Sequence, residues 1–136
     1  MNIVIDTNIF MAALIKKEGL IREIIINSKD NFLFPDFEFQ EIYKYKNEIL
    51  EKSGYSEAEF IQAVSLLLGH MRIIKFEEIC NYYNEASAII SKIDQEDIIF
   101  IATALAFNAK IWSDDTHFKM QDKIKCLTTP DMKNCL

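Results

Sequence analysis

The feature that most constrains the fold is a short apolar run that ends in an acid, Ile3-Val4-Ile5 followed by Asp6. Successive side chains of a strand point to opposite faces, so a run without a polar member indicates a strand buried on both faces. Strands of this kind belong to parallel sheets that helices cover on both sides. In open parallel sheets, ligands gather at the carboxyl ends of the strands, and Asp6 occupies such an end.

Strands and helices are predicted to alternate along the rest of the chain. The spacing of apolar residues and the turn signals predict strands over residues 2–5, 32–34, 72–76, 110–112 and 124–127. They predict helices over residues 8–13, 20–28, 36–49, 57–69, 79–91 and 96–107. This alternation predicts an α/β fold with a parallel sheet covered on both faces.

Two of the predicted helices carry a start signal. Asp36 follows Pro35, and its side chain can accept hydrogen bonds from the free amides of the first turn. Ser56 and Glu59 have the spacing of a capping box, and the helix that they open is expected to end near Gly69.

Length and charge restrict the class of protein. The 136 residues, half of them hydrophobic, suit one domain with one core over residues 1–136. The net charge of −6 argues against a broad nucleic-acid surface held by counterion release, so any phosphate contact must be local. The basic residues available for such contacts are Lys16, Lys17, Arg22, Lys44, Lys46, Lys119, Lys123 and Lys125.

Cysteines and apolar runs indicate the compartment. Cys80, Cys126 and Cys135 are odd in number and contain no CxxC pair, so neither a disulfide framework nor a zinc cage is indicated. The longest apolar run, residues 98–107, is shorter than the roughly 20 residues that span a bilayer, and no signal peptide is recognisable. We expect a soluble cytoplasmic protein without a membrane partner.

Acidic side chains at four places indicate a shared metal site. Asp6 and Asp115 each follow an apolar run, Asp97 begins one, and Glu41 lies on the helix after Pro35. If the strands before Asp6 and Asp115 are neighbours, both carboxylates open into one crevice. Carboxylates that close together raise one another's pKa unless a cation lies among them. A set of oxygen ligands favours Mg²⁺ or Mn²⁺ over zinc.

Motifs along nearly the whole chain support a family resemblance. In order, they are Val4-Ile5-Asp6-Thr7-Asn8, a glutamate on the helix after a proline, Asp94-Gln95-Glu96-Asp97 before an alanine-rich helix, and Ile111-Trp112-Ser113-Asp114-Asp115. This order resembles the PIN-domain ribonucleases, and among them the small VapC-like toxins. The resemblance implies a three-layer α/β/α sandwich with a parallel sheet of about five strands. It also implies metal-dependent cleavage of RNA, an antitoxin protein as partner, and frequent homodimers.

The same resemblance assigns residues to the site. Asp6, Glu41, Asp97 and Asp115 match the family's acidic quartet, as catalytic residues and metal ligands. Thr7, Asn8 and Ser113 match groups that orient the ligands through hydrogen bonds.

Some choices stay open. The family commonly has Thr-Gly-Asp where this chain has Ser113-Asp114-Asp115, so Asp114 can replace or supplement Asp115 as a ligand. Glu38 competes with Glu41, which is preferred because the family places its glutamate several residues past the proline. Asp94 is interpreted as the cap of the next helix.

Other side chains have ordinary structural interpretations. His70 and His117 are single histidines, which are more often structural or exposed than catalytic. The aromatic residues at 37, 39, 43 and 45 are interpreted as helix packing and as a face for a dimer or a partner.

Three alternative functions compete with the nuclease. A metal-dependent phosphatase of the haloacid-dehalogenase type carries a second acid two residues after the first, where this chain has Asn8. A receiver-type domain needs an acceptor and a lysine that are not recognisable here. A non-catalytic PIN-like module that binds RNA or protein would lack some of the acids, yet all four positions are filled.

Overall fold

A five-stranded parallel sheet organises the computed structural model, which describes residues 1–135. The strands are β1 (Asn2–Ile5), β2 (Asn31–Pro35), β3 (Met71–Ile74), β4 (Lys110–Trp112) and β5 (Cys126–Leu127). Their order across the sheet is β3-β2-β1-β4-β5, and each neighbouring pair is parallel. The order places β1 at the centre, with β2 and β4 on its two sides.

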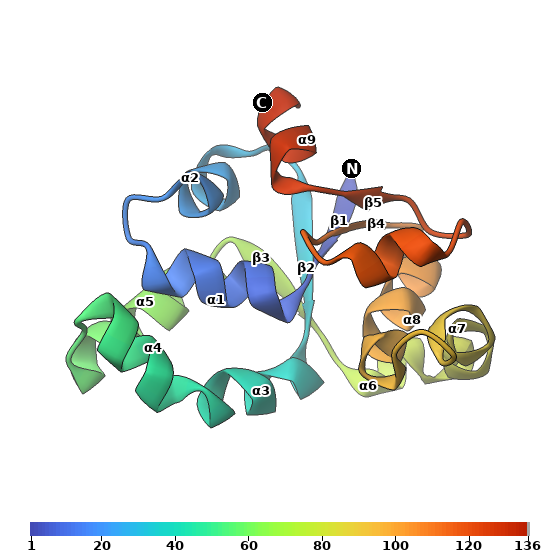
Figure 1. Cartoon of the computed structure of the whole chain (residues 1–136), viewed down its shortest axis with the longest axis horizontal. Coiled ribbons are helices and arrows are strands. Elements are labelled where there is room, and N and C mark those ends of the chain that lie inside the picture. The colour runs from blue at the N-terminus through green and yellow to red at the C-terminus, as the bar shows by residue number, and fades with distance from the viewer. Residues whose placement is uncertain (136) are drawn as a thin grey trace.

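Helices cover both faces of this sheet (Figure 1). One layer contains α1 (Thr7–Ile15), α2 (Leu20–Asn27), α3 (Phe39–Lys44), α4 (Lys46–Ser53), α5 (Glu57–Leu68) and α9 (Thr129–Asn134). The other contains α6 (Phe76–Ile79), α7 (Tyr83–Ile90) and α8 (Ile98–Phe107). The predicted three-layer α/β/α sandwich with a parallel sheet is therefore confirmed.

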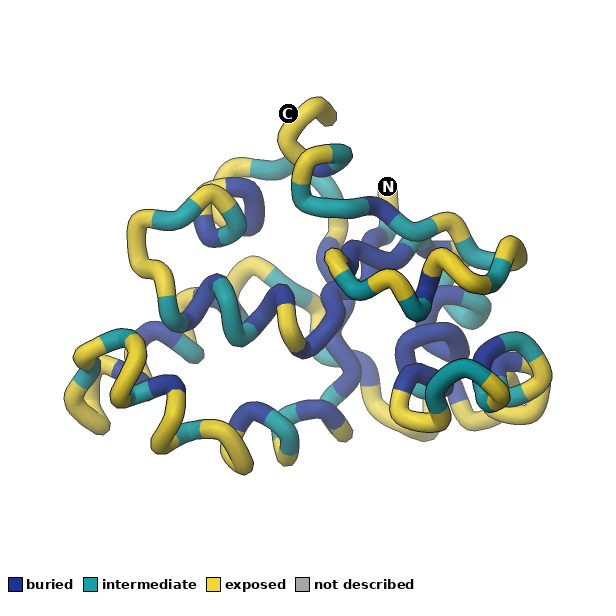
Figure 2. Tube along the Cα trace, viewed as in Figure 1, coloured by how far each residue is buried: buried dark blue, intermediate teal, exposed yellow. Residues whose placement is uncertain are grey.

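The apolar run of β1 supplies both cores, as its pattern predicts. Ile3 and Ile5 pack into the core beneath α1, α2, α4 and α5. Val4 points to the opposite face and is paired in register with Leu33 of β2 and Ile111 of β4 in the second core. All three residues of the run are at most 1% exposed, and Figure 2 shows the centre of the sheet buried between helices whose outer surfaces are exposed.

The sequence predicts most elements correctly as helix or strand but places several of their ends wrongly. The capping box at α5 is confirmed, because the Ser56 hydroxyl accepts a hydrogen bond from the Glu59 amide and the Glu59 carboxylate accepts one from the Ser56 amide. The helix predicted over residues 36–49 is instead a 3-10 turn η1 (Asp36–Glu38) followed by α3 and α4. Asp36 does not cap it, since the N-cap position falls on Pro35, which has no side-chain acceptor.

Two further segments differ from the prediction. The helix predicted over residues 79–91 begins earlier, at Phe76, and the 3-10 turn η2 (Cys80–Tyr82) divides it. Helix α9 was not predicted, although its start is signalled by a capping box of Thr128 and Asp131 around Pro130. Among residues 1–135, no helix is both long and apolar enough to cross a membrane.

A buried arginine joins two helices and the loop between α4 and α5. Arg22 of α2 is 5% exposed. Its Nε donates to the carbonyl oxygen of Ala13 at 2.9 Å, and its Nη2 donates to the carbonyl of Leu14 at 3.2 Å. Nη2 also donates to the hydroxyl of Tyr55 at 2.9 Å. The guanidinium thus satisfies carbonyl groups near the C-terminus of α1 that have no partner within that helix.

Replacing Arg22 by methionine is expected to lower the free energy of unfolding by about 2–4 kcal/mol, because buried carbonyl acceptors lose a charged donor. Urea unfolding measures this loss. The matched control is Arg72→Met, since the exposed Arg72 pairs with Glu78 on the surface and should contribute less than about 1 kcal/mol. Equal losses in both variants would contradict the role given to Arg22.

Candidate functional site

The centre of the site is formed by two neighbouring strands. Ile5 of β1 is in register with Trp112 of β4, so the residues after both strands meet at the same edge of the sheet. The amide of Asp6 donates to the carbonyl oxygen of Trp112 at 3.2 Å. The hydroxyl of Ser113 donates to Oδ2 of Asp6 at 2.8 Å, and both side chains are buried. Ser113 therefore orients the Asp6 carboxylate, as the resemblance implies.

Strand β2 brings a glutamate to the same edge of the sheet. Glu38 lies on η1, directly after β2, and is 7% exposed. The hydroxyl of Thr7 donates to its Oε2 at 3.1 Å. Glu41, one turn later, is partly buried and lines the same cavity. Both glutamates therefore face the site, but Glu38 is the one held by Thr7.

Two further segments complete the acidic group. Asp97 ends the 3-10 turn η3 (Gln95–Asp97) and is 8% exposed at the start of α8. Asp94 caps η3 through the Glu96 amide, as predicted. Asp115 is the N-cap of the 3-10 turn η4 (Thr116–Met120), and its side chain accepts a hydrogen bond from the amide of His117 at 2.9 Å.

These side chains surround a cavity of about 800 Å³. Among the described residues that line it, eight are acidic and one, Lys52, is basic. The acidic ones are Asp6, Glu38, Glu41, Glu48, Asp94, Glu96, Asp97 and Asp115. Such an excess of negative charge repels an anionic ligand and attracts a cation.

The crowding of acids changes their protonation. Burial raises the pKa of Asp97 to about 7, and the charges of Asp94, Asp6 and Asp115 act in the same direction. Burial likewise raises the pKa of Glu38 to about 7, while the hydrogen bond from Thr7 lowers it. The pKa of Asp6 is also raised, again mainly by burial, although Ser113 opposes the shift. The ionised site therefore needs a compensating positive charge.

An unpaired atom supports a divalent cation as that charge. Oδ2 of Asp97 is buried and has no hydrogen-bond partner among the described residues. Carboxylate oxygens are the ligands that Mg²⁺ and Mn²⁺ prefer. Asp6, Glu41, Asp97 and Asp115 all line one cavity, and their carboxylate oxygens are of the kind that such a cation binds.

The alternative ligand Asp114 has a different task. Its Oδ1 accepts a hydrogen bond from the Thr129 amide at 2.7 Å, and its Oδ2 accepts one from the Thr129 hydroxyl at 2.6 Å. It is not among the residues that line the cavity, whereas Asp115 is. The position of Asp114 supports a role in holding the start of α9 and leaves Asp115 as the ligand candidate.

Substitution of these two neighbours is expected to separate the roles. Asp115→Asn should weaken Mn²⁺ binding by at least about ten-fold, because it removes a charge from the cavity. Asp114→Asn should leave the affinity nearly unchanged and lower the free energy of unfolding by about 1 kcal/mol, since a cap is weakened. Calorimetric titration and urea unfolding measure the two effects. The opposite ranking of the affinities would reassign the ligand to Asp114.

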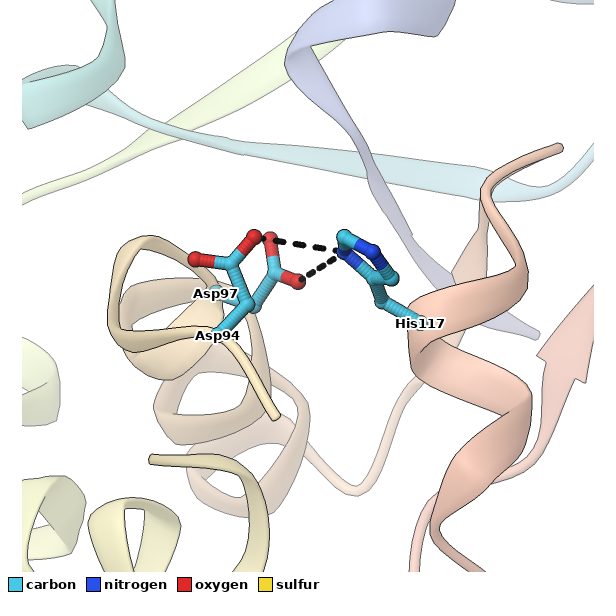
Figure 3. A group of neighbouring side chains, drawn as sticks. All are labelled: Asp94, Asp97 and His117. Atoms are coloured by element: carbon cyan, nitrogen blue, oxygen red, sulfur yellow. Dashed lines mark ion pairs between the residues drawn. The ribbon is translucent and has the colours of Figure 1, made fainter. Parts of the chain in front are cut away.

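The sequence-predicted residues other than Asp114 gather at this site, and His117 joins them. Asn8 lines the cavity with an exposed side chain. His117, interpreted from sequence as structural or exposed, has a side chain that is 44% exposed and that faces Asp94 and Asp97 (Figure 3). Glu38, which competes with Glu41 in the sequence, lines the cavity together with it, so both remain candidates. For His117, no local pattern distinguishes it from a surface histidine.

Comparisons with known proteins agree with this fold. A chain in the crystal structure of VapBC2 from Rickettsia felis, bound to a DNA fragment from the promoter, is 19% identical with a TM-score of 0.70. The alignment covers 94% of this chain and 98% of that one. A chain of VapBC-1 from nontypeable Haemophilus influenzae is also 19% identical, with a TM-score of 0.68 over 96% of this chain and 99% of that one.

Sequence comparison identifies the family. No curated protein matches the sequence significantly. The family model of the PIN domain, however, matches residues 4–133. This match includes the acidic residues from Asp6 to Asp115 and all five strands except the first residues of β1. The chain therefore belongs to the PIN domain family.

Proposed function

We propose that this protein is an endoribonuclease that hydrolyses RNA phosphodiester bonds with the help of Mg²⁺ or Mn²⁺. The observation that carries the proposal is the meeting of Asp6, Asp97 and Asp115 in one acidic cavity at the carboxyl edge of the sheet. Membership of the PIN domain family supports it, since proteins of this family are generally nucleases. The proposed ligands are Asp6, Glu41, Asp97 and Asp115, and Glu38 adds a further buried carboxylate.

The residues of the chain prepare the site before a substrate arrives. Ser113 fixes one oxygen of Asp6, and Thr7 fixes one oxygen of Glu38, so neither carboxylate needs to reorient. A bound divalent cation supplies an activated water and neutralises charge on the phosphate. The carboxyl group of Glu38, with a pKa of about 7, can accept or release a proton near neutral pH.

The cavity favours single-stranded RNA as substrate. The acids repel phosphates, so the RNA backbone can enter the cavity only at the point where a bound cation offsets this repulsion. Phe76 and Tyr83 line the same cavity and are substantially exposed, which suits stacking with unpaired bases. A splayed loop or a single strand presents such bases, whereas a regular duplex does not.

We further propose that the protein is the toxin of a VapBC-type pair, with a protein antitoxin as its partner, and that it forms a homodimer. The similar chains come from structures described as VapBC2 and VapBC-1, which supports the pairing. The exposed aromatic side chains of Phe37, Tyr43 and Tyr45 offer an apolar surface for such an interface.

Cleavage of total RNA by the purified chain tests the enzymatic proposal. Discrete products are expected with Mn²⁺ or Mg²⁺ and none with EDTA or with Asp6→Asn. Asp122→Asn is the matched control, because the same change at an exposed carboxylate outside the cavity should leave cleavage intact. Single-stranded DNA in a parallel reaction tests the preference for RNA. Binding of RNA without cleavage under any metal would favour the non-catalytic module instead.

A further inference from the structure

His117 reaches into the acidic site from an element that the sequence motifs do not include. It belongs to η4, whereas Asp94 and Asp97 belong to the start of α8, and Figure 3 shows the imidazole facing both carboxylates. Nδ1 of His117 lies 3.2 Å from Oδ2 of Asp94 and 3.9 Å from Oδ2 of Asp97. It lies 3.5 Å from Oδ1 of Asp115. One nitrogen thus faces three carboxylates.

Packing beneath η4 holds the backbone at His117 in place. Phe118, the next residue, is fully buried, and its ring meets that of Phe100 of α8 edge to face at 6.1 Å. The His117 amide is bound to Asp115, so the backbone at both ends of the residue is restrained. The fold therefore sets the backbone position from which the imidazole, whose side chain is 44% exposed, faces Asp94 and Asp97.

The contacts of Nδ1 are not those of a hydrogen-bonded ion pair. Nδ1 is buried and, among the described residues, makes no hydrogen bond, because the nearby oxygens are poorly aligned with it. Oδ2 of Asp97 is likewise buried and has no partner. A buried donor and a buried acceptor left unsatisfied 3.9 Å apart are costly, and a group bound between them removes that cost.

The distances suit a cation as that group. Nitrogen and oxygen ligands about 2.1 Å from one ion lie roughly 3–4.2 Å from each other, depending on the angle between them. The separations of 3.2, 3.5 and 3.9 Å from Nδ1 fall in this range. Suitable atoms of Asp94, Asp97 and His117 all lie within 4.8 Å of one another, so a small side-chain rotation completes the set.

We propose that His117 is a metal ligand whose Nδ1 joins the carboxylates of Asp94 and Asp97 around a divalent cation, and that this nitrogen makes the site prefer Mn²⁺ to Mg²⁺. Imidazole nitrogen binds transition metals well, whereas Mg²⁺ prefers oxygen ligands and retains its waters. The inference deepens the proposed function and rests on its metal site, since Asp97 belongs to both sets.

Pulsed electron paramagnetic resonance of the purified chain loaded with Mn²⁺ tests the ligand directly. Wild type is expected to give a nitrogen coupling typical of bound imidazole. The coupling should vanish in His117→Ala and persist in His70→Ala, the matched control at the chain's other histidine, which precedes β3 and lines a different pocket. Bound Mn²⁺ without nitrogen coupling in the wild type would overturn the proposal, whatever the variants do.

Calorimetric titration tests the preference for the metal. His117→Ala should weaken Mn²⁺ binding by at least about ten-fold and Mg²⁺ binding much less. Equal weakening of both ions, or none, would overturn the preference. Failure of the two proposals is distinguishable: RNA cleavage with an all-oxygen Mn²⁺ site would refute only the histidine ligand. Nitrogen-bound Mn²⁺ without cleavage of any RNA would refute only the ribonuclease.

Discussion

Replacing Asp97 by asparagine is expected to abolish RNA cleavage and, at the same time, to stabilise the metal-free protein. The two effects have one cause, because Asp97 is a buried carboxylate with acidic neighbours and an unpaired oxygen. Asparagine keeps the shape of the side chain but removes the charge. The cation then loses a ligand, and the metal-free site loses a repulsive group.

The magnitudes follow from these roles. Loss of a ligand is expected to cost about 4 kcal/mol in the transition state, which corresponds to a rate roughly a thousand-fold lower. Relief of burial and repulsion should raise the free energy of unfolding at pH 8 without metal by about 1–3 kcal/mol. Few substitutions of a buried residue stabilise a fold, so an increase is diagnostic of a crowded charged site.

Cleavage assays and thermal unfolding in EDTA measure both quantities. Asp122→Asn, at an exposed carboxylate, controls for the general effect of removing one negative charge and should change neither. Adding Mn²⁺ should raise the melting temperature of wild type and of Asp122→Asn more than that of Asp97→Asn. Wild-type cleavage by Asp97→Asn would remove this residue from the site, and strong destabilisation would mean that its charge is already compensated within the protein.

The sequence was sufficient to locate the site residues that lie at ends of regular elements. Asp6 and Ser113 follow strands whose buried, apolar character is plain, and parallel neighbours must end at the same edge. Asp97 precedes the apolar run that forms α8. For these residues, the period of the apolar pattern determines the position of the side chain, so no tertiary information was needed.

The choice between Glu38 and Glu41 depends on geometry that the pattern does not encode. A regular helix over residues 36–49 was expected, but the segment begins with a 3-10 turn, and that turn places Glu38 against Thr7. A 3-10 turn has three residues per turn and a regular helix 3.6, so the two forms direct Glu38 differently.

The contact between His117 and Asp94 could not be predicted for a different reason. Their segments lie on separate elements, η3 and η4, and neither has a strong periodic signal. What joins them is the packing of Phe118 against Phe100, which is a tertiary contact. The predicted capping role of Asp94 is confirmed, because its Oδ1 accepts a hydrogen bond from the Glu96 amide. Its other oxygen, Oδ2, faces His117.

Through Glu38, the stability of the metal-free protein is expected to fall as the pH rises. A carboxylate whose pKa is lowered by folding would make the stability rise instead. The pKa of Glu38 is about 7 in the folded chain and near 4.5 when the chain unfolds. Between these values, the folded state holds a proton that the unfolded state has lost. The folded state therefore binds more protons, and the contribution of Glu38 to stability falls as the pH rises from about 4.5 to 7.

The variant Glu38→Gln isolates this contribution. Glutamine keeps an oxygen that can accept the hydrogen bond from Thr7, but it does not titrate. In EDTA, the melting temperature of Glu38→Gln minus that of wild type should be small at pH 4.5 and should grow to about 5–10 °C at pH 8, equivalent to roughly 2–3 kcal/mol. Glu85→Gln, at an exposed position outside the cavity, should show no such growth.

A divalent cation should reverse the trend, because it binds the ionised form of the site. Protons compete with the cation for the same carboxylates, so the rise in melting temperature caused by Mn²⁺ should increase between pH 5 and pH 8. The increase should be smaller in Glu38→Gln, whose site carries one negative charge less. A metal effect that is independent of pH in wild type would mean that the cation binds away from the buried carboxylates. A difference between Glu38→Gln and wild type that is already full at pH 4.5 would mean that Glu38 is ionised at that pH and that the cavity does not hold its proton.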